Sequence, residues 1–282
     1  RGSEVARSAA ATIPYLSGAW APNVHLPEET ALLLRRFLDR FPGLDIVVCS
    51  VVGSHYYGFP SANSDVDLKG IHATSLPSLI GLSCPTEHHS FLGNVDGLIV
   101  DFDTNELRKA LLGCLAGNGS MLERLTSPLL IAHGDEERLA ELRQAVLANL
   151  NRGYYVHYSG FARNVCERIH PDRPTSIKTI LYFFRVALTG VHLLTKGECI
   201  GDLGVLLDLY PFKGVRRLIE LKRQGEEAQI DSPDQYLEAM GELTRLLDQA
   251  RTNSPLPEKA AKVEMIDKAL MKWRLSGGVA GR

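Results

Sequence analysis

Short hydrophobic runs and helical periods alternate along the first 135 residues of the chain. A run rich in β-branched residues at 44–52 stops at Gly53, which predicts a buried central strand. Alternation over 66–72 and an apolar run at 98–102 predict two more strands. The remaining elements expected here are an amphipathic helix of about 12 residues after Pro27, a turn or short helix within 53–64, a short helix at 75–80, a helix after the pattern at 103–106 that ends at Gly117, and another that starts at Ser120.

A helical period takes over from about residue 136, and strand-like alternation does not recur. Prolines and glycines separate the candidate helices, which are 136–150, 152–168, 176–196, 201–209, 214–224, 233–252 and 258–274. The pattern predicts an N-terminal segment (1–24), an α+β domain (25–135) and an all-helical C-terminal domain (136–282).

The composition is that of an ordinary globular protein, with 45% hydrophobic and 23% charged residues among 282. Five scattered cysteines without a C-x-x-C pattern argue against a disulfide framework and a structural zinc site. No run of about 18 apolar residues suggests a transmembrane helix. No basic-then-apolar start resembles a signal peptide, so no contact with a membrane and a cytoplasmic location are expected.

Charge divides the chain into an acidic and a basic half. Residues 1–150 hold 17 acidic and 11 basic residues, whereas residues 151–282 hold 16 acidic and 20 basic residues. An acidic half beside a basic half suits a metal site next to a surface that meets polyanions, but it also suits an ordinary two-domain protein. The candidate phosphate contacts are Lys213, Arg216, Arg217, Lys222 and Arg223, with Lys259, Lys262, Lys268, Lys272 and Arg274 near the C-terminus.

A glycine-rich turn follows the first predicted strand. Gly53 and Ser54 stand where the backbone turns, and a helix that begins there would present free N–H groups to an anion. Glycine permits a phosphate to approach the backbone closely, and Ser54 adds a hydroxyl donor. Most turns of this kind bind nothing, so the turn gains weight only from the acids that follow it.

Those acids are Asp65 and Asp67, which are two positions apart and therefore project to one face of a strand. Like charges this close favour a cation between them, and Mg²⁺ prefers carboxylate ligands together with substrate phosphates. The third predicted strand offers Asp101 as a third ligand. Asp103 shares that face, but the pattern Asp103-x-x-Glu106 is explained by a helix cap.

Written in full, the turn reads Gly53-Ser54-x-x-x-Gly58 and the acidic strand reads Ser64-Asp65-x-Asp67-x-x-Gly70. Together these motifs resemble the signature of the DNA polymerase β-type nucleotidyltransferase superfamily. Further stretches resemble the predicted nucleotidyltransferases of the "RNA repair pathway DNA polymerase beta" family, namely 101–111, Gly117-Asn118, Leu122-Glu123, Ser127-Pro128, His157-Tyr158-x-Gly160-x-Ala162-Arg163, and Ile177-Lys178 with Tyr182 and Arg185. The resemblance spans about residues 45 to 210.

The resemblance implies a small mixed sheet with a helical domain behind it, Mg²⁺ or Mn²⁺ as cofactor, and an NTP substrate in the cleft between the domains. It implies Asp65, Asp67 and Asp101 as metal ligands and catalytic residues. Gly53, Ser54, Ser64, Lys178, Tyr182 and Arg185 would bind the nucleotide. Two positions depart from the family pattern, since His55 replaces a small residue or Arg, and Gly119 replaces a Pro; neither removes a carboxylate.

Three more residues are candidates for substrate binding: His157, Arg163 and Glu123. Each also has a structural interpretation, as a core histidine, a surface charge and a buried salt bridge. Whether Asp103 or Glu123 joins the metal site stays open. His88 and His89 are expected in a polar loop without metal-ligand spacing.

The predicted reaction is Mg²⁺-dependent transfer of a nucleotidyl group from an NTP to a hydroxyl, with pyrophosphate as leaving group. Asp101 is the expected base-like partner of that hydroxyl, and the resemblance implies an RNA end, in repair or tRNA processing, as acceptor. Alternatives are a small-molecule acceptor such as an aminoglycoside, a protein side chain, a non-catalytic nucleotide-binding or antitoxin-like module, and a metal-dependent phosphohydrolase. The sequence leaves the choice of NTP, the number of nucleotides added and the oligomeric state open.

Overall fold

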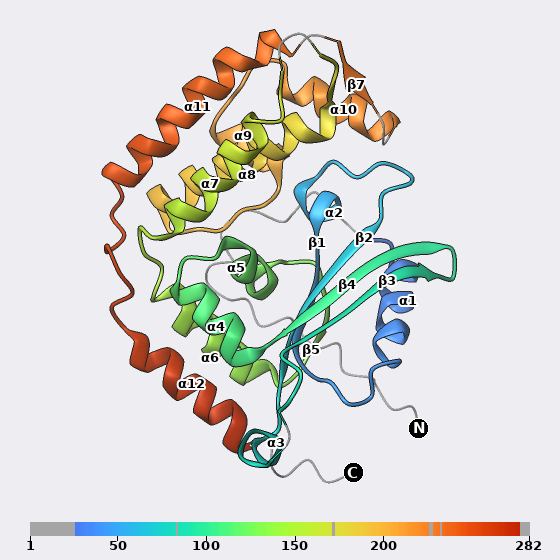
Figure 1. Cartoon of the computed structure of the whole chain (residues 1–282), viewed down its shortest axis with the longest axis vertical. Helices are drawn as coiled ribbons and strands as arrows, with labels where there is room; N and C mark the ends of the chain where they lie inside the picture. Colours follow the sequence, from blue (N-terminus) through green and yellow to red (C-terminus); the bar gives the residue numbers. More distant parts are fainter. Residues whose placement is uncertain (1–25, 83, 171–172, 226–227, 232, 277–282) are drawn as a thin grey trace, which may run out of the picture.

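The computed structural model describes residues 26–82, 84–170, 173–225, 228–231 and 233–276, so the expected segment 1–24 lies outside the described residues. The elements follow in the order α1 (Glu28–Leu38), β1 (Asp45–Val52), α2 (Gly53–Tyr57), β2 (Val66–Ala73), α3 (Leu76–Ile80), β3 (His88–Val95), β4 (Leu98–Glu106), α4 (Leu107–Leu115), α5 (Gly119–Thr126), β5 (Leu130–His133), α6 (Glu136–Leu147), α7 (Tyr154–Cys166), β6 (Thr175–Ser176), α8 (Ile177–Lys196), α9 (Leu203–Leu209), α10 (Val215–Gln224), β7 (Gln229–Ile230), α11 (Asp234–Thr252) and α12 (Val263–Ser276). Figure 1 shows the sheet in one half of the molecule and the helices α7 to α11 in the other.

A five-stranded mixed sheet forms the centre of the first half. Its strand order is β3-β4-β2-β1-β5, and β2 and β4 run parallel while the other neighbours are antiparallel. The connection from β2 to β4 passes through the edge strand β3, which lets β4 lie directly beside β2. The α+β class with a mixed sheet and many helices is therefore confirmed.

Two hydrophobic clusters cover the two faces of this sheet. On one face, Phe37 of α1 packs in a cluster with Leu68 and Phe102. On the other face, Leu122 of α5 packs in a larger cluster with Ile71, and this cluster continues into the helices of the second half. Alternation along β2 turns its odd-numbered polar residues toward the helical side, and this is what places the candidate site there.

Helix α8 is the centre of the helical half, where it packs against α7, α9, α10 and α11. It begins after Ser176 and ends at Gly197, whose φ of +73° forms a left-handed cap. By length and composition α8 could cross a membrane, but its apolar stretch of 18 residues is 83% buried inside the protein. That burial is typical of a core helix. The expected absence of membrane contact and the cytoplasmic location stay predictions.

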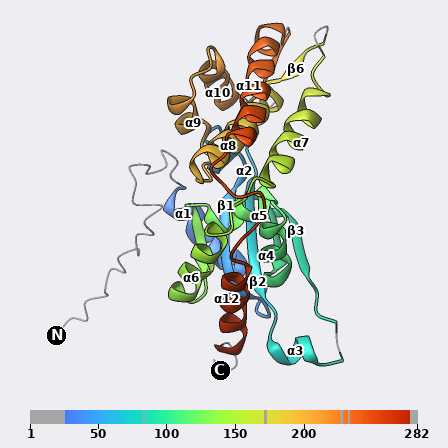
Figure 2. The same ribbon diagram turned by 90° about the vertical axis from the view of Figure 1, so that its left-hand side faces the viewer.

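The last helix returns to the half of the molecule that contains the sheet. Figures 1 and 2 show α12 beside α6 and α4, away from α10. Lys272 pairs with Glu141 of α6 at 2.5 Å, and Arg274 pairs with Glu106 at the end of β4 at 2.7 Å. Two helices from the predicted C-terminal domain, α6 and α12, thus lie against α4 of the predicted N-terminal one. The boundary near residue 135 stays a prediction.

The predicted helices agree with the structure to within a few residues, and the three predicted strands are present as β1, β2 and β4, but β3, β5, β6 and β7 were not predicted. His88 and His89 begin β3 rather than a loop. This strand lies at the edge of the sheet with one face open, as the 73% exposure of Leu92 shows, so it lacks a clear buried period. Residues 130–133 form β5, a four-residue edge strand. The helical half also contains the paired strands β6 and β7, which at two residues each are too short to show alternation.

Candidate active site between the sheet and the helices

Two of the predicted ligands lie side by side on neighbouring strands. Asp67 of β2 and Asp101 of β4 are paired in the parallel register, so their side chains project from the same face of the sheet. Asp65 lies one residue before β2 begins, rather than inside the strand as expected. The side chain of Asp101 is 39% exposed, so it is open to a ligand.

Burial, together with the neighbouring carboxylates, changes the pKa of Asp67. Burial, followed by the charge of Asp65 and with a further contribution from Asp101, raises this pKa from 3.8 to about 6, while Lys69 and Lys178 oppose the shift. The charged form of Asp67 is therefore disfavoured mainly by desolvation and in smaller part by the neighbouring carboxylates. A divalent cation would offset both effects.

Gly53 owes its identity to the closeness of Asp67. Its φ is +65°, and a Cβ at this position would stand 2.6 Å from Cγ of Asp67 and even nearer to Oδ2. Only glycine avoids both the strained backbone and this clash. The turn and the acidic strand predicted from the sequence are thus in direct contact, with Asp67 seated on the backbone that begins α2.

The two serines near this turn differ in their surroundings. Ser54 is 3% exposed, and its hydroxyl has no hydrogen-bond partner in the described part of the chain. The hydroxyl of Ser64 lies 3.0 Å from the backbone N of Ser61, which donates to it, and 3.1 Å from the Ser61 hydroxyl. Ser64 therefore stabilises the loop that leads to Asp65, whereas Ser54 has a donor to spare.

The interpretation of Asp103 as a helix cap was wrong. Strand β4 continues to Glu106, whose own side chain caps α4 by accepting a hydrogen bond from the backbone N–H of Arg108 at 2.7 Å. Asp103 lies inside β4 and forms ion pairs with Lys69 at 2.8 Å and with Arg124. Burial opposes its charge, but the hydrogen bonds and charges of Arg124 and Lys69 still lower the pKa of Asp103.

Lys69 and Arg124 are charged residues of this site that the sequence reasoning missed. Lys69 is two positions after Asp67, so it projects to the same face, and its ammonium also lies 2.9 Å from Oδ1 of Asp101. Strand parity could have identified Lys69. Arg124 comes from α5, and only the fold brings it to β4.

A buried ion pair joins the helical half to the turn. Glu123 of α5 and Arg185 of α8 form a salt bridge at 2.5 Å, and each side chain is 6% exposed. The hydroxyl of Tyr57, from α2, donates a 2.9 Å hydrogen bond to the second oxygen of Glu123. The guanidinium of Arg185 lies 3.8 Å from the centre of the Tyr57 ring. Glu123 and Arg185 therefore hold α2 in place through their contacts with Tyr57.

A cavity of about 230 Å³ opens between these groups. Its walls contain Gly53, Asp67 and Lys69 on the sheet side. Its helical side consists of Ser120, Glu123, Arg124, Phe161, Tyr182 and Arg185, and Val52 and Tyr57 complete it. Two larger hollows of about 740 and 670 Å³ lie elsewhere, between α1 and β5 and between the far end of the sheet and α12, and the three acids line neither.

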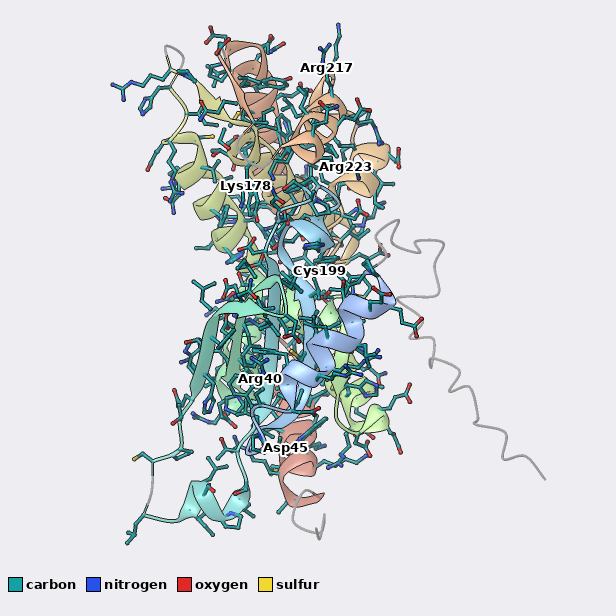
Figure 3. The ribbon with its side chains drawn as sticks, turned by 90° about the vertical axis from the view of Figure 1, so that its right-hand side faces the viewer. Arg40, Asp45, Lys178, Cys199, Arg217 and Arg223 are labelled. Atoms are coloured by element: carbon teal, nitrogen blue, oxygen red, sulfur yellow. The ribbon has the colours of Figure 1, made fainter. Side chains whose placement is uncertain are left out.

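Of the remaining predicted site residues, Tyr182 lines this cavity, whereas Lys178, His157 and Arg163 are not part of its lining. Burial raises the pKa of Tyr182 to about 12, and the charge of Asp67 adds to the shift. Lys178 lies one turn before Tyr182 on α8, and Figure 3 shows it in the helical half near the junction with the sheet. Burial lowers the pKa of His157, despite the opposing effect of Glu123. Arg163 is exposed on α7.

The basic residues expected to contact phosphates do not form one surface. Lys222 is fully buried in α10, and the basic residues of α12 lie at the other end of the molecule from α10 (Figures 1 and 2). Lys213, Arg217 and Arg223 remain exposed, and Figure 3 shows Arg217 and Arg223 on the helical half that also contains Lys178.

Asp65, Asp67 and Asp101 are the residues that could hold a metal ion, and they fit one in part. In the described ranges, no three His, Cys, Asp or Glu side chains come close enough together to hold a metal as they stand. Burial and the neighbouring acids disfavour the charge of Asp67, and oxygen ligands suit Mg²⁺ or Mn²⁺. Lys69 occupies one oxygen of Asp101, so a metal at this carboxylate would have to displace it.

Comparison with known proteins decides the family. The model of the RNA repair pathway DNA polymerase beta family matches residues 32–272. The chain belongs to this family. A relative, the protein YcgL of Bacillus subtilis (strain 168), is 26% identical over 226 residues, which cover 76% of this chain and 84% of that protein.

A solved structure shows a weaker likeness. The nucleotidyltransferase-like protein from Exiguobacterium sibiricum 255-15 covers 88% of this chain and 77% of its own at 16% identity, with a TM-score of 0.30, too low to support an inference. Membership of the RNA repair pathway DNA polymerase beta family therefore rests on the match over 32–272, and it confirms the resemblance read from the motifs. It identifies a polymerase-β-like nucleotidyltransferase fold.

Proposed function

We propose that this protein is a divalent-cation-dependent nucleotidyltransferase that moves a nucleoside monophosphate from an NTP to a hydroxyl, most simply the hydroxyl at an RNA end. One observation supports the proposal above all others: the parallel register sets Asp67 beside Asp101, while Gly53 brings the phosphate-binding turn onto Asp67. Together with the family match, this arrangement joins an acidic face to a turn that admits phosphate.

The residues have distinct tasks in the proposed reaction. Asp65, Asp67 and Asp101 would hold Mg²⁺ or Mn²⁺, which when bound lowers the pKa of the attacking hydroxyl and neutralises the leaving pyrophosphate. The backbone at Gly53 would hold the triphosphate, as would the hydroxyl of Ser54, which has no hydrogen-bond partner among the described residues.

Asp101 would accept the proton of the acceptor hydroxyl. At the same time, the oxygen of that hydroxyl would form a bond to the α-phosphorus of the NTP. The bond from that phosphorus to the bridging oxygen breaks, and pyrophosphate leaves. The solvent-exposed carboxylate of Asp101 suits this role better than Asp103, whose two oxygens are already paired with cations.

The cavity supports the placement of the nucleotide. It contains Gly53 and Asp67 on one wall and the aromatic Tyr182 and Phe161 on the other, so a base or ribose next to the triphosphate would meet apolar ring surface. Lys178 and the exposed basic residues of α10 lie on the same half and would attract the phosphates of an RNA acceptor. The RNA acceptor is the finer part of the proposal.

The test is label transfer from each α-³²P NTP, with Mg²⁺ or Mn²⁺ and bulk tRNA. Wild-type protein should place label in RNA, whereas Asp67→Asn and Asp101→Asn should lose at least about a hundredfold, because each removes a charged ligand and keeps the shape. The matched control is Asp267→Asn, an exposed carboxylate on α12 at the far end of the molecule, which should behave as wild type.

The remaining outcomes distinguish the alternatives. Label on a small hydroxyl compound or on the protein itself would keep nucleotidyl transfer and replace the acceptor. Absence of transfer with every NTP, while an NTP still binds, would favour a non-catalytic nucleotide-binding module. Release of inorganic phosphate without transfer would indicate a phosphohydrolase.

A further inference from the structure

Lys69 occupies the centre of the acidic face. Its side chain is 14% exposed, and its ammonium lies 2.9 Å from Oδ1 of Asp101 and 2.8 Å from Oδ2 of Asp103. The ammonium therefore lies between two carboxylates, where a divalent cation would also find oxygen ligands.

The two carboxylates that hold Lys69 are not equivalent. Asp103 is 17% exposed, with one oxygen paired to Lys69 and the other to Arg124. Arg124 is itself fixed, because its Nη1 also donates to the backbone oxygens of Gly70 at 3.4 Å and Asp103 at 3.3 Å. Asp103 is thus a rigid anchor for Lys69.

Asp101, by contrast, is the more exposed partner at 39%, and its register neighbour is Asp67. Lys69 can therefore release Asp101 and keep its bond to Asp103. The same ammonium also lines the cavity next to Gly53 and Asp67, so a lysine released from Asp101 stays within the site.

We propose that Lys69 is the resident counter-ion of the acidic face and competes with a divalent cation for Asp101, so that it sets the metal affinity of the site. This rests on the proposed function, because it assumes that Asp101 is a metal ligand. A lysine that only braced β2 against β4 would affect stability and leave metal affinity unchanged.

The variants follow from this competition. Lys69→Met keeps the aliphatic stem and removes the competing charge, so we expect the Kd for Mn²⁺ to fall about tenfold. An opposite charge within hydrogen-bonding distance commonly shifts the affinity of a carboxylate for a proton by roughly tenfold or more, and tenfold corresponds to about 1.4 kcal/mol. Lys69→Arg keeps the charge and should restore the wild-type Kd within about threefold.

The measurement is titration of the full chain with Mn²⁺ alone, without NTP, followed by the EPR signal of free Mn²⁺ and by calorimetry. Circular dichroism and thermal melting establish that each variant is folded, and Lys69→Gln serves if the methionine variant is not. The matched control is Lys109→Met on α4, which removes an equal charge at an exposed lysine whose acidic partner, Glu87, is 3.7 Å away. That variant should bind Mn²⁺ as wild type does.

The Asp101→Asn background separates competition from a general field effect. If Lys69 acts through Asp101, Lys69→Met should change the Kd less than twofold there. Tightening of full size in that background would overturn the proposal, as would an unchanged or higher Kd for Lys69→Met in the wild-type background. Wild-type binding of Mn²⁺ with no effect of Lys69 would leave the proposed function intact. A folded protein that binds no Mn²⁺ in any variant would overturn both.

Discussion

The buried pair of Glu123 and Arg185 allows a sharp test of how the helical half supports the site. Glu123→Gln keeps the shape of the side chain and an oxygen that can accept the hydrogen bond from Tyr57, but it leaves the guanidinium of Arg185 without its counter-charge. Because both side chains are 6% exposed, water cannot replace the lost partner. Breaking one partner of a buried pair costs about 3–5 kcal/mol, and we expect about 3 kcal/mol here.

Urea unfolding followed by circular dichroism measures this loss as the shift in midpoint multiplied by the m-value. Arg185→Met should cost a similar amount, and the double variant should cost less than the sum by about 2 kcal/mol, since it leaves no lone charge. The exposed pair of Arg216 and Asp208, at 54% and 62% exposure, is the matched control, and Asp208→Asn should change stability by less than about 1 kcal/mol.

A cost below about 1 kcal/mol for Glu123→Gln would refute this reasoning, because it would mean that the pair is solvated or that Arg185 finds another partner. A double variant whose loss of stability equals the sum of the losses of the two single variants would also refute this reasoning. The hydrogen bond from Tyr57 gives the pair a second consequence: loosening Glu123 should loosen α2 and the turn at Gly53, so NTP affinity should fall together with stability.

Three further predictions concern other parts of the molecule. Gly53→Ala places a methyl group against Asp67 at a φ of +65°, so it should cost at least about 1 kcal/mol in urea unfolding and weaken Mn²⁺ binding, whereas Gly241→Ala on α11, with nothing within 4 Å, should be neutral or stabilising. In EDTA, the raised pKa of Asp67 means that the folded state holds a proton between about pH 4 and 6 that the unfolded state has lost, so stability falls as pH rises through this window. Asp67→Asn should therefore raise the melting temperature at pH 7.5 but not at pH 4. An equal change of melting temperature at both pH values would contradict this prediction. Trp273→Ala removes a 3% exposed side chain by which α12 packs near Arg138, and should cost about 3–5 kcal/mol, against a negligible loss for the exposed Leu275→Ala.

The sequence predicted most of the helices and the motif that matters, because both depend on local patterns. A helical period of ten residues or more identifies a helix whatever packs around it. The alternation of a strand is likewise enough to place Asp67 on the helical side of the sheet. The pairing of Asp67 with Asp101 depends instead on the strand order, in which β4 crosses back beside β2. Local patterns contain no information on that crossing.

The wrong predictions came from sequence patterns that fit more than one type of secondary structure. An acidic residue three positions before a Glu is typical of a helix cap, but the same spacing also occurs in strands. Asp103 lies in a strand, where its ion pairs with Lys69 and Arg124 are stronger than hydrogen bonds to backbone N–H groups. Edge strand β3 escaped notice because only one of its faces is covered. Arg124 belongs to a helix that reaches the site only in three dimensions.

The position of α8 has a consequence for the synthesis of this protein on the ribosome. Its apolar surface is covered partly by α7, which is made before it, and partly by α10 and α11, which are made after it. A nascent chain that has not yet reached Thr252 therefore carries a 20-residue helix as apolar as a membrane span that still lacks the complete α11. Folding of the helical half has to wait for the end of α11, and chains released early should need a chaperone or be degraded.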